Sequence, residues 1–224
     1  MRKIIFKGFI VVLLVVFVTQ MTQYNLTIAE KKKISLDEFR EKNIKIQCKD
    51  KIYNDITVNI MNRVKYFPVA ECSNQNMKVN FENTWMNERT YGGKRGHEGT
   101  DLIASVNKRN IYPIVSMTDG TVTQKGWLEK GGYRIGITTE EGVYFYYAHL
   151  ASYASVEVGD HIKAGDLLGF MGDSGYGPEG TVGQFAVHLH LGIYVEINGE
   201  EFSLNPYWLL RYIENKTVKW YTEI

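Results

Sequence analysis

Residues 184–197 form a strictly alternating stretch, and this pattern constrains the fold of the chain more than any other feature. Since successive side chains of a β-strand point to opposite faces, the stretch predicts a strand with one face packed in a hydrophobic core. His188 and His190 fall on the opposite face, where two imidazoles are unusual as packing residues. From this segment alone, a solvated histidine pair on a surface strand remains an alternative. The predicted core face comprises Phe185, Val187, Leu189, Leu191, Ile193, Val195 and Ile197.

Short β-rich runs separated by turn signals continue this pattern from about residue 63 onward. Glu141-Gly142 and Asn198-Gly199 are typical of hairpin tips, because glycine adopts positive φ without steric cost. The runs lie at residues 121–123, 133–139, 143–148 and 166–171. Together they predict a mainly β fold, built on a small antiparallel sheet with few helices.

The composition limits the classes of protein to which the chain can belong. Its 224 residues are 44% hydrophobic and 23% charged, which is typical of one globular domain with a modest extra segment. The net charge is +1 and no stripe of lysine and arginine stands out, so the sequence lacks the basic surface that is typical of nucleic-acid-binding proteins. The basic run at residues 31–33 is interpreted as a solvated juxtamembrane face.

The first residues have the charge order of an export signal. Arg2, Lys3 and Lys7 precede an apolar run over residues 8–18, so the remainder of the chain is predicted to lie outside the cytoplasm. No small-x-small cleavage site follows the run. We therefore expect an uncleaved anchor over residues 1–23 and a single-pass protein of the cell membrane, with its main domain extracytoplasmic. A cleaved signal peptide and a secreted protein are the alternative.

The remaining chain divides into three parts. Residues 24–62 are expected to be a juxtamembrane linker or stalk, and an inhibitory or docking role for them stays open. Residues 63–212 carry the β-rich pattern of the main domain, and residues 213–224 form a C-terminal tail.

The two cysteines, Cys48 and Cys72, would both be exported, and a disulfide or two separate thiols are equally compatible with the sequence.

One further cluster carries metal-binding chemistry. His97 and Asp101 enclose a glycine, and a bend at Gly99 can bring imidazole and carboxylate round one ion. Glycine also disfavours a regular helix here, so Glu98 is not expected to act as the base of a helical zinc motif. His149 follows a run of tyrosines at a predicted strand end. Alone it is typical of a structural residue.

These residues, in this order, resemble the lysostaphin-type (LytM-like) family of zinc endopeptidases over about residues 66–210. The resemblance rests on the sequences RGHEGTD from residue 95, DGTV from 119, YAHL from 147, HLH from 188 and the Asn205-Pro206 pair. One departure is a longer, glycine-rich segment over residues 176–187, which we interpret as a lid or one wall of a substrate groove.

The resemblance implies one zinc ion held by His97, Asp101 and His190, with a water in the fourth position. It implies that His149 and His188 flank that water as catalytic residues. Three protein ligands and an open position are the arrangement of a catalytic zinc. The implied fold is an antiparallel β domain crossed by a groove.

The implied activity is hydrolysis of peptide bonds in peptidoglycan stems or cross-bridges, during cell-wall remodelling. Two alternatives stay open. One is a catalytically silent scaffold or amidase activator with a cell-wall, division or sporulation protein as its partner. The other is a peptidase that acts on secreted proteins or glycine-rich peptides.

Overall fold

The computed structural model describes residues 56, 59–72 and 77–221. The expected anchor, most of the expected linker and Cys48 lie outside these residues. Within the described part, no helix is both long enough and apolar enough to cross a membrane. Cys72 is a buried free thiol.

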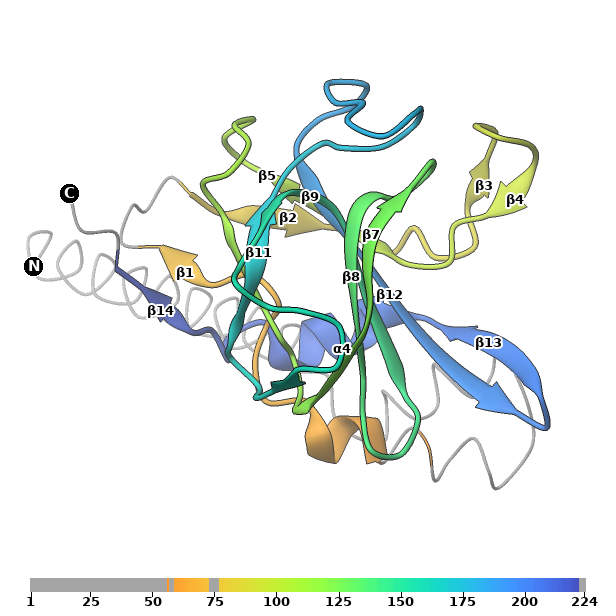
Figure 1. Ribbon diagram of the computed structural model, residues 1–224, viewed down its shortest axis with the longest axis vertical. Helices are drawn as coiled ribbons and strands as arrows, with labels where there is room; N and C mark the ends of the chain where they lie inside the picture. The colour runs from red at the N-terminus through yellow and green to blue at the C-terminus, as the bar shows by residue number, and fades with distance from the viewer. Residues whose placement is uncertain (1–55, 57–58, 73–76, 222–224) are drawn as a thin grey trace, which may run out of the picture.

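One large sheet dominates the molecule (Figure 1). Its main path of strands has the order β10-β7-β8-β9-β12-β5-β2. In addition, β11 pairs with both β9 and β6, and β13 pairs with β12. All of these strand pairs are antiparallel. The predicted antiparallel, mainly β fold is confirmed. The strands are β1 (Glu71–Cys72), β2 (Val79–Phe81), β3 (Glu88–Arg89), β4 (Arg95–Gly96), β5 (Thr100–Ala104), β6 (Pro113–Val115), β7 (Gly120–Leu128), β8 (Gly132–Thr138), β9 (Tyr144–Tyr153), β10 (His161–Ile162), β11 (Leu167–Met171), β12 (His188–Ile197), β13 (Glu200–Leu204) and β14 (Lys219–Trp220).

Strand β12 shows the predicted alternation over most of its length. Val187, which directly precedes the strand, and the alternate residues from Leu189 to Val195 are at most 3% exposed and belong to the core. Phe185 was predicted on this core face, and that prediction is wrong. The strand begins only at His188, so the period of two does not extend back to Phe185, whose ring instead contacts the rings of His149 and His188.

Both predicted hairpin tips are present. Gly142 joins β8 to β9 with φ of 83°, and Asn198 and Gly199 join β12 to β13 with φ of 55° and 83°. Consecutive residues at positive φ match the twist of the flanking strands, which explains the Asn-Gly sequence at the second tip.

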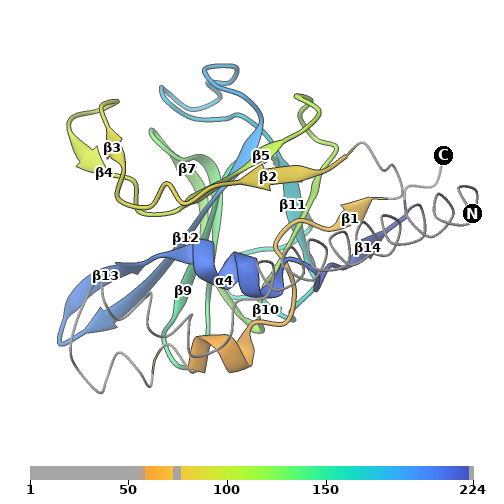
Figure 2. The same cartoon turned by 180° about the vertical axis from the view of Figure 1, so that it is seen from behind.

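The helix α4 (Pro206–Ile213) contributes to the core and lies beside β12 (Figure 2). Its start follows from the Asn205-Pro206 pair. The Asn205 side chain accepts a hydrogen bond from the Tyr207 amide at 3.1 Å, and proline occupies a first-turn position that needs no amide donor. Leu209, Leu210 and Ile213 lie in the core.

The packed unit extends past residues 63–212 at both ends. Ile60 and Met61, from a helical turn at residues 59–63, are core residues. At the other end, β14 pairs in parallel with β1, and the two strands lie side by side in Figure 2. Part of the expected tail is therefore a structural strand.

Candidate metal centre and active site

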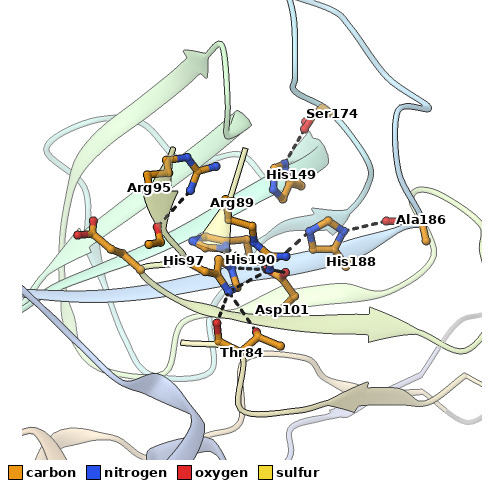
Figure 3. Close-up of polar contacts among 12 residues, drawn as sticks. Thr84, Arg89, Arg95, His97, Asp101, His149, Ser174, Ala186, His188 and His190 are labelled. Atoms are coloured by element: carbon orange, nitrogen blue, oxygen red, sulfur yellow. Dashed lines mark hydrogen bonds and ion pairs between the residues drawn. The ribbon is translucent and has the colours of Figure 1, made fainter. Parts of the chain in front are cut away.

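Two paired strands and the loop before one of them bring His97, Asp101 and His190 together. Asp101 on β5 stands directly opposite His190 on β12, and His97 lies just before β5. Figure 3 shows the three side chains converging on one point. The potential ligand atoms of this group all lie within 4.8 Å of one another.

The spacing of these atoms suits a zinc ion. His97 Nε2, His190 Nδ1 and Asp101 Oδ1 form a triangle in which each pair of atoms is 3.0 Å apart. Tetrahedral zinc with bonds of about 2.0–2.2 Å separates neighbouring donor atoms by about 3.3 Å. Two imidazoles and one carboxylate also match the donor types that zinc prefers.

The partners of His97 determine which ring nitrogen faces the triangle. Its Nδ1 lies 3.1 Å from the carbonyl oxygen of Thr84, which can only accept a hydrogen bond. That contact places the proton on Nδ1 and leaves the Nε2 lone pair for a metal ion. Arg89 lies beside the same nitrogen, but its Nη2 donates to Asp101 Oδ2 at 2.8 Å. The Thr84 carbonyl thus orients His97, and Arg89 orients Asp101.

Asp101 is ionised in this environment. Burial by itself would raise the pKa of its carboxyl group, but the close approach of the His190 and His97 imidazoles outweighs burial and holds the pKa well below its usual range. Burial lowers the pKa of His190, so this imidazole is neutral and able to bind a metal ion.

Gly99 allows His190 to approach the chain before β5. A Cβ atom at this position would lie 2.5 Å from His190 Cε1 and 2.6 Å from the Leu191 carbonyl oxygen. Residues 97–99 are not helical, as the glycines predict, and Glu98 is exposed outside the triangle. The glycine is therefore required by contact with the neighbouring strand.

His149 lies inside β9 and not at a strand end, which corrects the sequence prediction. The register runs three residues along β9, from Tyr147 to Leu150, against two along β8, from Ile135 to Tyr133. This bulge holds His149 at φ of 62° and turns it out of the core, while Tyr147 and Leu150 on either side are fully buried. Such a conformation costs about 1–3 kcal/mol in a residue other than glycine and is concentrated at functional sites.

His149 and His188 lie next to each other beside the triangle, with ring centroids 4.6 Å apart (Figure 3). The Ser174 carbonyl lies 2.7 Å from His149 Nδ1, and the Ala186 carbonyl lies 2.8 Å from His188 Nδ1. Each carbonyl fixes the proton on Nδ1 and leaves Nε2 as a proton acceptor. Burial lowers the pKa of both imidazoles, and repulsion from His188 lowers that of His149 further.

A groove of about 370 Å³ contains all five of these residues. Tyr176 forms part of one wall, and Phe185 covers the two flanking histidines, so the longer segment at residues 176–187 borders the groove. Tyr91, at the tip of the β3–β4 hairpin, stacks on Tyr176 with ring centroids 4.2 Å apart. Tyr144, Tyr146 and Tyr194 also line the groove.

Sequence reasoning missed the arginines of this groove. Arg89 sits on β3 and Arg95 on β4, and the Gly92-Gly93 pair between them was a usable turn signal. Arg134 on β8 had no local signal, because its place beside the site depends on strand pairing. His161, left out of the predicted site, lies on β10 and contacts Thr121 at the sheet edge.

Comparisons with known proteins agree with this geometry. The chain is 42% identical over 132 residues to L-Ala--D-Glu endopeptidase of Bacillus subtilis (strain 168), an overlap of 58% of this chain and 39% of the relative. It is 32% identical over 130 residues to the glycyl-glycine endopeptidase ALE-1 of Staphylococcus capitis, covering 54% of this chain and 33% of that protein. The chain thus spans less than half the length of these curated relatives.

A solved structure and a family profile extend the comparison. The crystal structure of a candidate glycyl-glycine endopeptidase, LytM, from Ruminococcus gnavus ATCC 29149 superposes with a TM-score of 0.70 and 60% identity, covering 75% of this chain and 68% of that one. The profile of peptidase family M23 matches residues 95–205, which hold all five site residues. This chain belongs to peptidase family M23.

Proposed function

We propose that this protein is a zinc-dependent endopeptidase that hydrolyses amide bonds in the peptide part of peptidoglycan. The observation that carries the proposal is the triangle of His97, Asp101 and His190 beside two histidines with acceptor nitrogens. His97, Asp101 and His190 would hold one zinc ion, through Nε2, Oδ1 and Nδ1. Zinc bound there would supply a Lewis acid for the scissile carbonyl and for a water molecule.

His149 and His188 would move protons during the reaction. Because burial lowers the pKa of both, each is neutral at neutral pH and can accept a proton from the attacking water at Nε2. The protonated imidazole can then donate to the departing amine. Their Nδ1 protons stay with the Ser174 and Ala186 carbonyls, which keep the rings oriented through the cycle.

The groove would hold an extended peptide across the five residues. Its walls carry aromatic side chains such as Tyr176, and its lining includes charged groups of both signs. The names of the relatives indicate two different bonds, one next to an acidic residue and one between glycines. Both bonds are amides, so the same catalytic residues serve either.

Hydrolysis of purified cell walls tests the proposal. The full chain in detergent, loaded with zinc, would be incubated with peptidoglycans of several cross-link types, and the fragments would be identified by mass spectrometry. We expect a new amino terminus whose appearance stops with a chelator and in His190→Ala, while His161→Ala remains active. If His190→Ala retained the biological role of the protein in cells, the protein would act as a scaffold.

The place of action is part of the proposal. The charge order of the first residues favours a membrane anchor over residues 1–23 with the peptidase domain outside the cytoplasm. Fractionation of cells, followed by protease treatment of intact spheroplasts, tests this placement. Recovery in the soluble cytoplasmic fraction would contradict it.

A further inference from the structure

Six arginines lie in the described part of the chain, and they fall into two groups. Four of them form ion pairs with carboxylates of the protein, whereas Arg95 and Arg134 form none within the described residues. These two also line the active-site groove. The four pairs are Arg63–Glu141, Arg89–Asp101, Arg109–Asp173 and Arg211–Glu214.

Both groove arginines have incomplete hydrogen bonding. Arg95 Nε and Arg134 Nη1 are buried without a hydrogen-bond partner. The contact from Arg95 Nη1 to the Gly96 carbonyl is long, at 3.5 Å, and Arg134 Nη2 donates only to the neutral amide of Gln124, at 3.0 Å. A guanidinium group offers five donors, and a buried donor without a partner is destabilising. Each of these side chains therefore has donors that no group in the described part of the protein accepts.

The two arginines approach the groove from different strands and share one neighbour. Arg134 lies on β8 and Arg95 lies on the β3–β4 hairpin. Tyr146 is within electrostatic reach of both; burial raises its pKa, and the two cations partly oppose that rise. The Tyr146 ring is 5.9 Å from the His190 ring. Tyr146 thus connects the metal-binding side of the groove to the arginines.

The groove contains two carboxylates that could in principle neutralise these cations. Glu98 and Glu201 both line it, yet neither forms an ion pair with Arg95 or Arg134 among the described residues. Lys130 adds a further cation to the same lining. The positive charge of the arginines is therefore left for a bound anion.

We propose that Arg95 and Arg134 form a carboxylate subsite, which selects a substrate with an acidic residue close to the scissile amide. This inference rests on the proposed endopeptidase function and names its substrate class. The planar guanidinium binds a carboxylate through two parallel hydrogen bonds, which gives direction as well as attraction. An acidic stem peptide carries such a carboxylate, whereas an oligoglycine bridge does not.

Direct binding tests the subsite without requiring turnover. The zinc-loaded full chain carrying His149→Ala, which keeps the peptide intact, would be titrated with a stem tetrapeptide. The acidic residue of this peptide has one free carboxylate that is not part of a peptide bond. The matched probe is the same peptide with that group as a carboxamide. We expect the free acid to bind about tenfold more tightly, because a charge-assisted hydrogen bond is stronger than a neutral one.

Variants of the arginines locate the effect. Adding Arg134→Gln or Arg95→Gln should remove the preference for the free acid and leave the affinity for the carboxamide within about twofold. Arg134→Lys should keep part of the preference, since the charge remains without the planar fork. Arg63→Gln, which lies outside the groove lining, is the matched control and should keep all of it.

Two results would overturn the subsite. One is equal binding of acid and carboxamide by the chain with both arginines present, and the other is a preference that survives both glutamine variants. Cleavage by the chain with His149 intact is measured separately on both peptides and on pentaglycine. Cleavage without preference would reject the subsite and keep the peptidase, whereas selective binding without any cleavage would reject the peptidase and keep the subsite.

Discussion

Asp101 and His190 stand directly opposite each other in the antiparallel ladder of β5 and β12, with Oδ1 and Nδ1 3.0 Å apart. Their meeting is therefore a property of strand register. Side chains on a strand alternate between faces, so a slip of one residue would turn one of the two into the core. The buried neighbours of His190 on β12, Leu189 and Leu191, stabilise the observed register because they occupy the opposite, core-facing side of the strand.

Removal of one member of the triangle is expected to abolish zinc binding. His190→Ala leaves His97 and Asp101, and two ligands hold zinc much more weakly than three. We expect elemental analysis after dialysis to find one zinc per chain in the original protein and none in the variant. His161→Ala, a histidine on β10, is the control and should retain its zinc. A variant that kept stoichiometric zinc would exclude His190 as a ligand.

Gly99→Ala is expected to displace His190. The added methyl group would meet the His190 ring and the Leu191 carbonyl at 2.5–2.6 Å, so the ring or the backbone must shift. We expect both a lower melting temperature and a lower affinity for zinc, measured by thermal denaturation and by competition with a chelator.

Gly142→Ala separates these two effects. Gly142 lies at a hairpin tip with φ of 83°, and a Cβ atom added there would meet nothing within 4 Å. Alanine there should cost about 1–2 kcal/mol of stability because of the backbone conformation, with no change in zinc affinity. If both variants had the same zinc affinity, the close contact of Gly99 with His190 would be irrelevant to the metal site.

The flanking histidines are expected to act on turnover and not on zinc content. His149→Ala and His188→Ala each remove one proton acceptor, for which a loss of about 10²–10⁴ in kcat is typical. Neither residue belongs to the triangle, so each variant should still contain one zinc. Single-turnover cleavage of purified peptidoglycan, with zinc content measured on the same samples, checks this. Full activity in either variant would remove that residue from the mechanism.

Asp119 is expected to stabilise the fold above acidic pH. Its Oδ1 accepts a hydrogen bond from the Ala164 amide at 2.7 Å and its Oδ2 lies 2.6 Å from Lys65 Nζ. The amide of Ala164, and then Lys65, hold the pKa of Asp119 below its usual value. A lowered folded-state pKa contributes stability above the unfolded-state value of about 3.9, and this stability is lost as pH falls through the folded-state pKa.

Asp119→Asn should therefore lower the melting temperature at neutral pH, and the difference from the original protein should shrink below about pH 3–4. Lys65→Met removes the ion pair alone and should have a smaller effect, because the hydrogen bond from Ala164 remains. Thermal denaturation across this pH range is the measurement. A difference that stayed constant with pH would show that the charge of Asp119 contributes nothing.

The stack of Tyr91 on Tyr176 is expected to hold the β3–β4 hairpin against the segment that borders the groove. Tyr176→Ala removes a parallel ring contact with an interplanar angle of 4°. Hydrogen–deuterium exchange in residues 90–96 should then become faster, while Tyr176→Phe, which keeps the ring, should not change it. Unchanged exchange in the alanine variant would show that the hairpin is held by other contacts.

Features that depend on local periodicity and turn chemistry could be predicted from the amino-acid sequence alone. The alternation in residues 184–197 placed His188 and His190 on one face, and the Glu-Gly and Asn-Gly pairs marked the tips at Gly142 and Gly199. The glycine of the H-x-x-x-D motif correctly argued against a helix. Periods of two and positive φ are properties of neighbouring residues, so they can be recognised without knowing which strands pair.

Features that depend on pairing between distant strands could not be predicted from the sequence and are visible only in the folded chain. The bulge that turns His149 toward His188 exists because β9 runs one residue longer than β8, and no local pattern encodes that mismatch. Phe185 does not follow the alternation for a similar reason. β12 begins at His188, which pairs with Ile103 of β5, and Phe185 precedes this paired region. The positions of Arg89, Arg95 and Arg134 in the groove lining likewise follow from the arrangement of strands in space. The sequence thus supplies the chemical groups, and strand pairing determines which of them meet.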